Sequence, residues 1–152
     1  MPEPFALGST SPRHGLPYLF PGQAQKEAFV NEALARLDTL VQATVFDERE
    51  QPPGTAQPGD AYLVAADAGG DWQGQDRAIA VWLGSNWLFA PPVEGASVRR
   101  LDTGQMLIYS DGWSAALEPA EPTGGTTVDA EARAAIAALI SALRHSGIFP
   151  AG

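Results

Sequence analysis

The sequence predicts an α+β protein, in which a small antiparallel β-sheet or a barrel of hairpins packs on one long helix. Two apolar segments, 78–90 and 106–113, each contain a central turn signal and therefore predict hairpins. An amphipathic segment precedes them, and a Pro- and Gly-rich stretch separates them from a second helical pattern. We expect four parts: an extended N-terminal arm (1–21), a helix-plus-hairpin domain (22–117), a linker (118–126) and a C-terminal helix (127–147).

The first 21 residues are rich in proline and show no helical or strand periodicity. Proline fixes φ and removes a backbone donor, so this segment is expected to be extended. It also contains Leu16, Tyr18 and Phe20, which favour burial. Such an arm lies either on its own domain or on a neighbouring subunit, and the sequence leaves both open.

A long helix is expected from Gly22 to about Gln42. Its apolar residues recur at i, i+3, i+4 and i+7, which is the spacing of one helical face. They are Ala28, Phe29, Ala33, Leu34, Leu37, Leu40 and Val41. This face requires a partner, and the sheet or another helix is the expected one.

The two hairpins share a pattern, with an aromatic residue before the turn and a tryptophan after it. Trp82 and Trp87 flank the first turn, and Tyr109 and Trp113 flank the second. We interpret this as one hairpin unit used twice. Further short strands are expected at 44–46, 61–66 and 95–101.

The C-terminal helix is expected to begin at a cap formed by Thr126 and Thr127 and to end near Gly147. One face shows 4-3-4 spacing, which is typical of a short coiled-coil seam. The seam residues are Ala132, Ile136, Leu139 and Leu143. Self-association and docking on the chain's own domain are both open.

Composition excludes several functional classes. The chain has 152 residues, a net charge of -9 and no cysteine. Acidity disfavours nucleic acid and anionic membranes as partners, and the lack of cysteine excludes disulfides and thiolate metal sites. Neither a membrane-spanning run nor a secretory signal pattern is expected.

No catalytic motif is recognisable. The two histidines, His14 and His145, stand alone, and no nucleophile elbow, phosphate loop or dinucleotide fingerprint occurs. Four aspartates surround Trp72 in sequence and raise the alternatives of a glycoside hydrolase or a calcium site: Asp60, Asp67, Asp71 and Asp76. Without EF-hand spacing, a role in turns is favoured. We therefore expect no enzymatic activity, no cofactor and no metal.

Several motifs are distinctive as a set: 16–26, 31–38, Gly59-Asp60-Ala61-Tyr62-Leu63-Val64, and Trp72-Gln73-Gly74 followed by 79–82. Over about Leu16 to Trp113, the chain resembles a phage-type domain of unknown function. That domain is found in tail fibres and in gene transfer agent particles of alphaproteobacteria.

The resemblance implies a virion structural protein, made in the bacterial cytoplasm and released with a phage-like particle. The chain lacks a long shaft, so a head-spike base or fibre adaptor is expected, binding itself and other capsid, spike or fibre proteins. The expected assembly contacts are Leu16, Tyr18, Phe20, Gln23, Gln25, Ile136, Leu139 and Leu143. The alternative is a carbohydrate-binding adhesin that recognises capsular polysaccharide by stacking on Trp72, Trp87 and Trp113.

Overall fold

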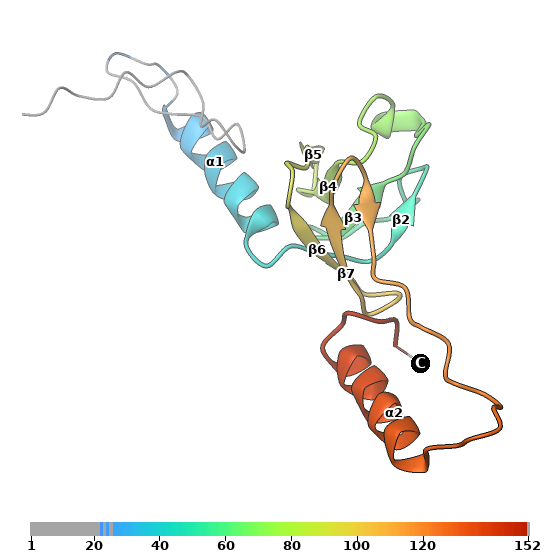
Figure 1. Ribbon diagram of the computed structural model, residues 1–152. Helices are drawn as coiled ribbons and strands as arrows, with labels where there is room; N and C mark the ends of the chain where they lie inside the picture. The colour runs from blue at the N-terminus through green and yellow to red at the C-terminus, as the bar shows by residue number, and fades with distance from the viewer. Residues whose placement is uncertain (1–21, 23, 25, 152) are drawn as a thin grey trace, which may run out of the picture.

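The computed structural model describes residues 22, 24 and 26–151 of the chain. The predicted arm, with Leu16, Tyr18 and Phe20, lies outside the described residues, and so do Gln23 and Gln25. The described part contains two helices and eight strands in two sheets, which confirms the α+β class. The body formed by the sheets lies between the two helices, which project from different sides of it (Figure 1).

Both sheets have four strands. The first has the order β1-β6-β7-β8 and the second the order β2-β3-β4-β5. Their bounds are β1 Thr44–Val45, β6 Ser97–Arg100, β7 Met106–Tyr109 and β8 Trp113–Ser114; then β2 Glu48–Arg49, β3 Ala61–Val64, β4 Ile79–Trp82 and β5 Trp87–Ala90. In each sheet a two-residue strand runs parallel to its neighbour, and the other pairs are antiparallel.

The sequence predicted antiparallel pairing and did not predict β2. The reason is physical, because a two-residue strand is too short to show an alternating pattern. The strand just before it in the sequence, β1, is equally short. The direction of each is fixed only by the strand it pairs with, β6 for β1 and β3 for β2. Both hairpins, by contrast, form where they were expected, as β4–β5 and β7–β8.

The two sheets repeat one another down to individual hydrogen bonds. Gly59 donates its backbone N–H to the Trp82 carbonyl over 2.8 Å, and Gly95 donates in the same way to Tyr109 over 2.9 Å. The aromatic pairs that close the hairpins also correspond, since Trp82 pairs with Trp87 as Tyr109 pairs with Trp113.

The parallel strands follow the same duplication. Leu63 donates its N–H to the Asp47 carbonyl, and Arg99 donates to the Ala43 carbonyl, both over 2.9 Å. A single segment, 43–49, therefore supplies the opening strand of both sheets. This confirms the interpretation of the hairpin as a repeated unit and extends it to a whole four-stranded sheet.

The core lies between the sheets and is made of small and aliphatic side chains from both. Its buried members are Ala43, Val45, Ala61, Leu63, Ile79, Val81, Ala90, Val98 and Leu107. A second cluster covers the other face of the β2-β3-β4-β5 sheet. There the one-turn helix η1, Gly70–Trp72, buries its tryptophan against Tyr62, Val64 and Ala80.

The first helix, α1, spans Lys26–Leu40 and the second, α2, spans Ala130–His145. The N-cap of α2 is Asp129, whose carboxylate accepts a hydrogen bond from the Ala132 N–H at 2.9 Å. This corrects the expected cap at Thr126 and Thr127. An aspartate one helical turn before the repeat of apolar residues satisfies the same free N–H groups and also interacts favourably with the helix dipole.

The C-terminal end of α2 is tied to the body. Gly147 has φ +77° and accepts a hydrogen bond through its carbonyl from the Met106 N–H at 2.6 Å. Ala151 donates to the Thr103 carbonyl at 2.9 Å, and the Gln105 amide donates to the Ile148 carbonyl at 3.3 Å. The predicted stop at Gly147 is confirmed, and it also marks the contact with the β6–β7 turn.

Substitution of Gly147 tests this contact. A Cβ there would lie 2.9 Å from the Gly104 carbonyl oxygen in addition to the unfavourable φ of +77°, whereas Gly74 has φ +76° and open space. We expect Gly74→Ala to cost about 1 kcal/mol of unfolding free energy and Gly147→Ala to cost more. Gly147→Ala should also speed proteolysis between residues 115 and 130. Equal effects of the two substitutions in denaturation and proteolysis would contradict the close contact.

Candidate functional site

The outer face of α1 is apolar. Among the described side chains of this helix, those turned toward the body are half-buried and include Arg36, whose guanidinium donates to the Phe89 carbonyl at 3.4 Å, and Leu40, which packs on the core. A helix turns by about 100° per residue, so the opposite side carries the row Val30, Leu34, Leu37 and Val41. All four are exposed, Leu34 by 56% and Val41 by 66%.

The predicted packing of α1 on the sheet is thus limited to one side and to its C-terminal half. The 4-3-4 spacing of Val30, Leu34, Leu37 and Val41 is that of a coiled-coil seam, and it faces away from the chain's own core. We call these four residues the α1 seam. An exposed row of aliphatic side chains on a helix indicates a contact surface for another polypeptide.

Most of α2 is exposed as well. Ile140 is its one buried residue, and Ile136 and Leu139 are exposed, Leu139 by 62%. Leu143 is half-buried and Ala132 is exposed. The structure therefore brings the predicted contacts Ile136, Leu139 and Leu143 together on one side of α2. With Ala132, we call them the α2 seam.

The linker before α2 is held by two arginines of that helix. Arg144 forms an ion pair with Glu118, donating from Nε to the carboxylate at 2.8 Å. Arg133 donates to the carbonyls of Pro122 and Gly124. The arginine lowers the pKa of Glu118 through its hydrogen bond. These contacts use the side of α2 that carries Ile140, so the α2 seam stays exposed except at Leu143, which is half-buried.

The tryptophans proposed for sugar stacking lie in different environments. Trp72 is fully buried, at 0% exposure, so the structure removes it from any stacking surface. Its ring meets Trp87 edge-on at 5.1 Å, and Trp87 meets Trp82 at 5.1 Å. Trp87 and Trp82 are half-buried and form an aromatic pair beside the first hairpin turn.

Trp113 belongs to the other sheet. It is half-buried, packs edge-on against Tyr109 at 5.3 Å, and donates its indole N–H to the Arg77 carbonyl at 2.8 Å. That hydrogen bond ties the second hairpin to the β2-β3-β4-β5 sheet, because Arg77 lies just before β4. Trp113 therefore has a structural role, and the structure does not bring it next to Trp87 in one aromatic surface.

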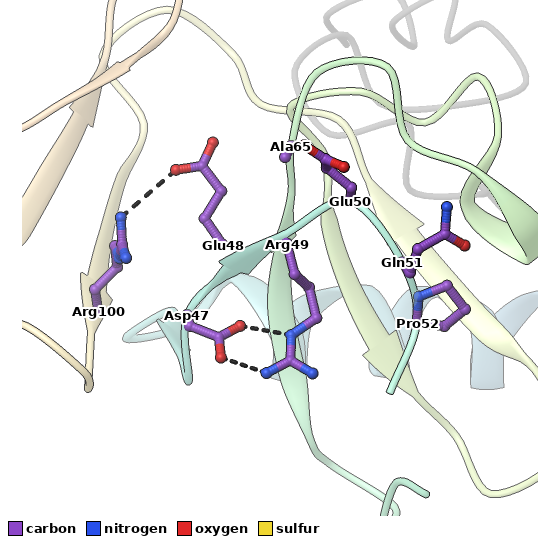
Figure 2. Close-up of a pocket in the computed structure, with 8 residues that line it drawn as sticks. All are labelled: Asp47, Glu48, Arg49, Glu50, Gln51, Pro52, Ala65 and Arg100. Carbon is purple, nitrogen blue, oxygen red and sulfur yellow. Dashed lines mark hydrogen bonds and ion pairs between the residues drawn. The ribbon is translucent and has the colours of Figure 1, made fainter. Parts of the chain in front are cut away.

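A broad, open groove runs beside β2 (Figure 2). Its lining is mostly charged and consists of Asp47, Glu48, Arg49, Glu50, Gln51, Pro52, Ala65 and Arg100. Sequence reasoning missed this groove, although the charged run at 47–50 was a visible signal. Arg49 is paired with Asp47 within the groove and lies over the Tyr62 ring at 4.5 Å. That pairing leaves little free cationic surface for a ligand.

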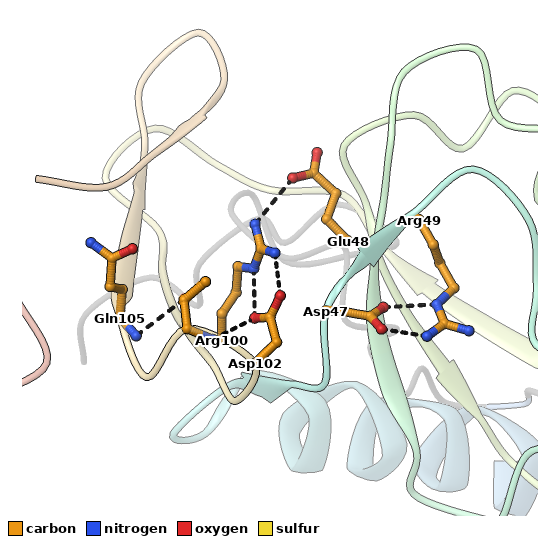
Figure 3. A network of polar contacts seen from close by, with 7 residues as sticks. Asp47, Glu48, Arg49, Arg100, Asp102 and Gln105 are labelled. Carbon is orange, nitrogen blue, oxygen red and sulfur yellow. Dashed lines mark hydrogen bonds and ion pairs between the residues drawn. The ribbon is translucent and has the colours of Figure 1, made fainter. Parts of the chain in front are cut away.

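Arg100 links the two sheets through charge (Figure 3). Its Nε donates to Asp102 at 3.0 Å, and its Nη1 lies 3.5 Å from Glu48 on the other sheet. The hydrogen bond from Arg100 lowers the pKa of Asp102, and the same bond raises the pKa of Arg100. The network is a partly exposed structural bridge rather than a reactive pair.

Two of the four loop aspartates bind backbone N–H groups of their loops. Asp60 accepts a hydrogen bond from the Gln57 N–H at 2.8 Å, and Asp76 accepts one from the Ala68 N–H at 3.3 Å. Across residues 22, 24 and 26–151, no group of three or more His, Cys, Asp or Glu is placed to hold a metal ion. In the same residues, neither helix has the length and apolar character needed to cross a bilayer.

Residues 30–114 match a family model described as a protein of unknown function, DUF2793, and the chain belongs to this family. The match begins at the first residue of the α1 seam and ends at the last residue of β8. The family unit is therefore the duplicated pair of sheets with most of α1, and α2 lies beyond it. Comparison with curated proteins gives no match.

The Arg100–Asp102 bond predicts a pH dependence. Because the folded-state pKa of Asp102 is lowered, its stabilising effect is present above its unfolded pKa of about 3.9 and is lost as the pH falls through the folded value. Asp102→Asn should cost up to about 1 kcal/mol of unfolding free energy at neutral pH, and the difference from wild type should shrink below about pH 4.

Urea titrations between neutral and acid pH measure this difference. Glu94→Gln, at an exposed carboxylate in the β5–β6 connection, provides the control and should stay within about 0.5 kcal/mol of wild type. A cost for Asp102→Asn that is the same at both ends of the pH range would refute the assignment.

Proposed function

We propose that this protein is a structural subunit of a phage-like particle, a gene transfer agent or phage, and acts as a head-spike base or fibre adaptor. One observation carries the proposal: α1 turns a row of four aliphatic side chains away from its own domain. The chain carries a net charge of -9, yet this exposed row has no charged residue. An exposed apolar row of this kind is expected where another polypeptide covers it. The subunit would be made in the bacterial cytoplasm and released with the particle.

The interior of the body supports a scaffold role rather than catalysis. The core between the sheets is closed and aliphatic, and both arginines of the groove are paired with its acidic side chains, Arg49 with Asp47 and Arg100 with Glu48. These pairs join an arginine to a carboxylate, and none of them places a nucleophile next to a general base. The resemblance of the motifs at 16–26 and 59–64 to phage and gene transfer agent domains gives the particle context.

The α1 seam offers a direct test. In a strain that encodes the protein and produces particles, the wild-type chain should purify with the particles, as measured by quantitative mass spectrometry. Leu34→Glu places a charge in the seam and should lower incorporation about tenfold or more, because the carboxylate would have to be buried without a partner.

Ala28→Glu is the matched control, since it adds the same charge at an exposed position of α1 outside the seam. It should be incorporated like wild type. Absence of the wild-type chain from purified particles, or equal incorporation of both variants, would reject the proposal. Circular dichroism of the purified variants checks that α1 is retained in each.

A second candidate function is recognition of capsular polysaccharide, and the paired rings of Trp82 and Trp87 favour it. Both are half-buried, lie 5.1 Å apart and border the first hairpin turn, beside the exposed Leu83. Adjacent aromatic faces at a surface are suited to stacking on sugar rings. In this version of the proposal Trp87 keeps its predicted role, while Trp72 and Trp113 have structural ones.

Retention on immobilised host capsular polysaccharide tests this candidate. Trp87→Ala should weaken retention about two- to tenfold, whereas Trp87→Phe should keep most of it because the ring is preserved. Trp113→Ala removes a comparable side chain from the other sheet and should bind like wild type once its folding is confirmed by thermal melting. Failure of the wild type to bind, or identical losses for Trp87→Ala and Trp113→Ala, would remove sugar recognition.

A further inference from the structure

We propose that α2 pairs in antiparallel orientation with α2 of a second copy of this chain. The helix has 16 residues, just above the roughly 12–15 below which an isolated helix is marginal in water, so packing of its apolar side against a partner would stabilise it. Within the described chain, α2 buries Ile140 and makes its polar contacts through Arg133 and Arg144. The α2 seam lies on the adjacent side, where the described part of the chain leaves Ala132, Ile136 and Leu139 exposed and Leu143 half-buried.

The spacing of the seam is symmetric, and an antiparallel pair uses it completely. Ala132, Ile136, Leu139 and Leu143 are separated by four, three and four positions. When two such helices run in opposite directions, Ile136 faces Leu139 of the second copy and Ala132 faces Leu143 of the second copy. The space beside the small Ala132 side chain of each helix is then filled by Leu143 of the other helix.

Charge selects both the partner and the direction. Asp129 caps the N-terminal end of α2 and Glu131 lies in its first turn, while Arg144, which also pairs with Glu118, and His145 lie in its last turn. An antiparallel pair brings unlike ends together and opposes the two helix dipoles, whereas a parallel pair brings like ends together. The seam itself is uncharged, so two copies of an acidic chain meet there without direct repulsion.

The inference deepens the proposed function and rests on it for its biological setting. It gives self-association to α2 and leaves the α1 seam for other particle proteins. The family match ends at Ser114, so the pairing belongs to a segment outside the family unit. Two helices of this length bury less than the roughly 1,600 Å² of a standard interface, so we expect micromolar rather than nanomolar affinity.

Sedimentation or light scattering across the micromolar range tests the pairing on the full chain. We expect the mass to rise toward twice the 16.0 kDa of one chain. Leu139→Glu should keep the mass at that of a monomer. Ser141→Glu, which adds the same charge on the far side of α2, should dimerise like wild type. Circular dichroism and thermal melting of both variants confirm that the body remains folded.

Single cysteines determine the direction, because the chain has none of its own. Under oxidising conditions, a mixture of Ala132→Cys and Leu143→Cys should give a disulfide-linked heterodimer on a non-reducing gel. Each variant alone should give at least severalfold less cross-linked product. Efficient cross-linking of each variant with itself would mean a parallel pair and would overturn the proposal.

A wild-type chain that stays monomeric throughout the micromolar range would overturn it too, and so would a trimer or a dimer insensitive to Leu139→Glu. These failures are separable from failure of the proposed function. Particle incorporation is measured with Leu34→Glu and Ala28→Glu on the other helix, so a monomeric chain that still enters particles rejects only the α2 pairing.

Discussion

The fold depends on one short segment that serves two sheets. Residues 43–49 supply β1 to one sheet and β2 to the other, with Val45 buried between them at 1% exposure. Because each sheet takes two residues from this one segment, the chain itself fixes the position of one sheet relative to the other. The charged bridge from Arg100 to Glu48 joins them again at the surface. Val45 of this segment joins the closed core together with Leu63 of one sheet and Val98 of the other.

Much of this architecture was visible in the sequence. A turn signal flanked by aromatic residues predicted each of the two hairpins. Gly147 predicted the end of α2, because the backbone conformation after a helix end suits few residues other than glycine. The parallel strands were not visible, since Thr44–Val45 and Glu48–Arg49 are too short to carry periodicity and gain their direction from distant partners. The burial of Trp72 was also hidden, because it depends on how η1 folds over the sheet rather than on local pattern.

The sequence predicted which residues of α1 are apolar, but not which side of the helix faces the body. The apolar spacing of α1 predicts a face to be buried and says nothing of which neighbour covers it. In the structure the body takes the side with Arg36 and Leu40, and the richer aliphatic side is left outside. A hydrophobic pattern predicts that a face is buried, but it does not indicate whether the same chain or another chain covers that face. For that reason the same sequence evidence was compatible with intramolecular packing.

The attachment of α2 has a mechanical consequence. The chain enters this helix from the stretch that holds Glu118 and leaves it through Gly147, and both of these points are anchored at its C-terminal end, by Arg144 and by Met106. A pull transmitted along α2 is therefore shared by two routes into the body, one through Glu118 and the chain that follows β8, the other through the β6–β7 turn. A load divided between two attachments meets more resistance than the same load carried by one.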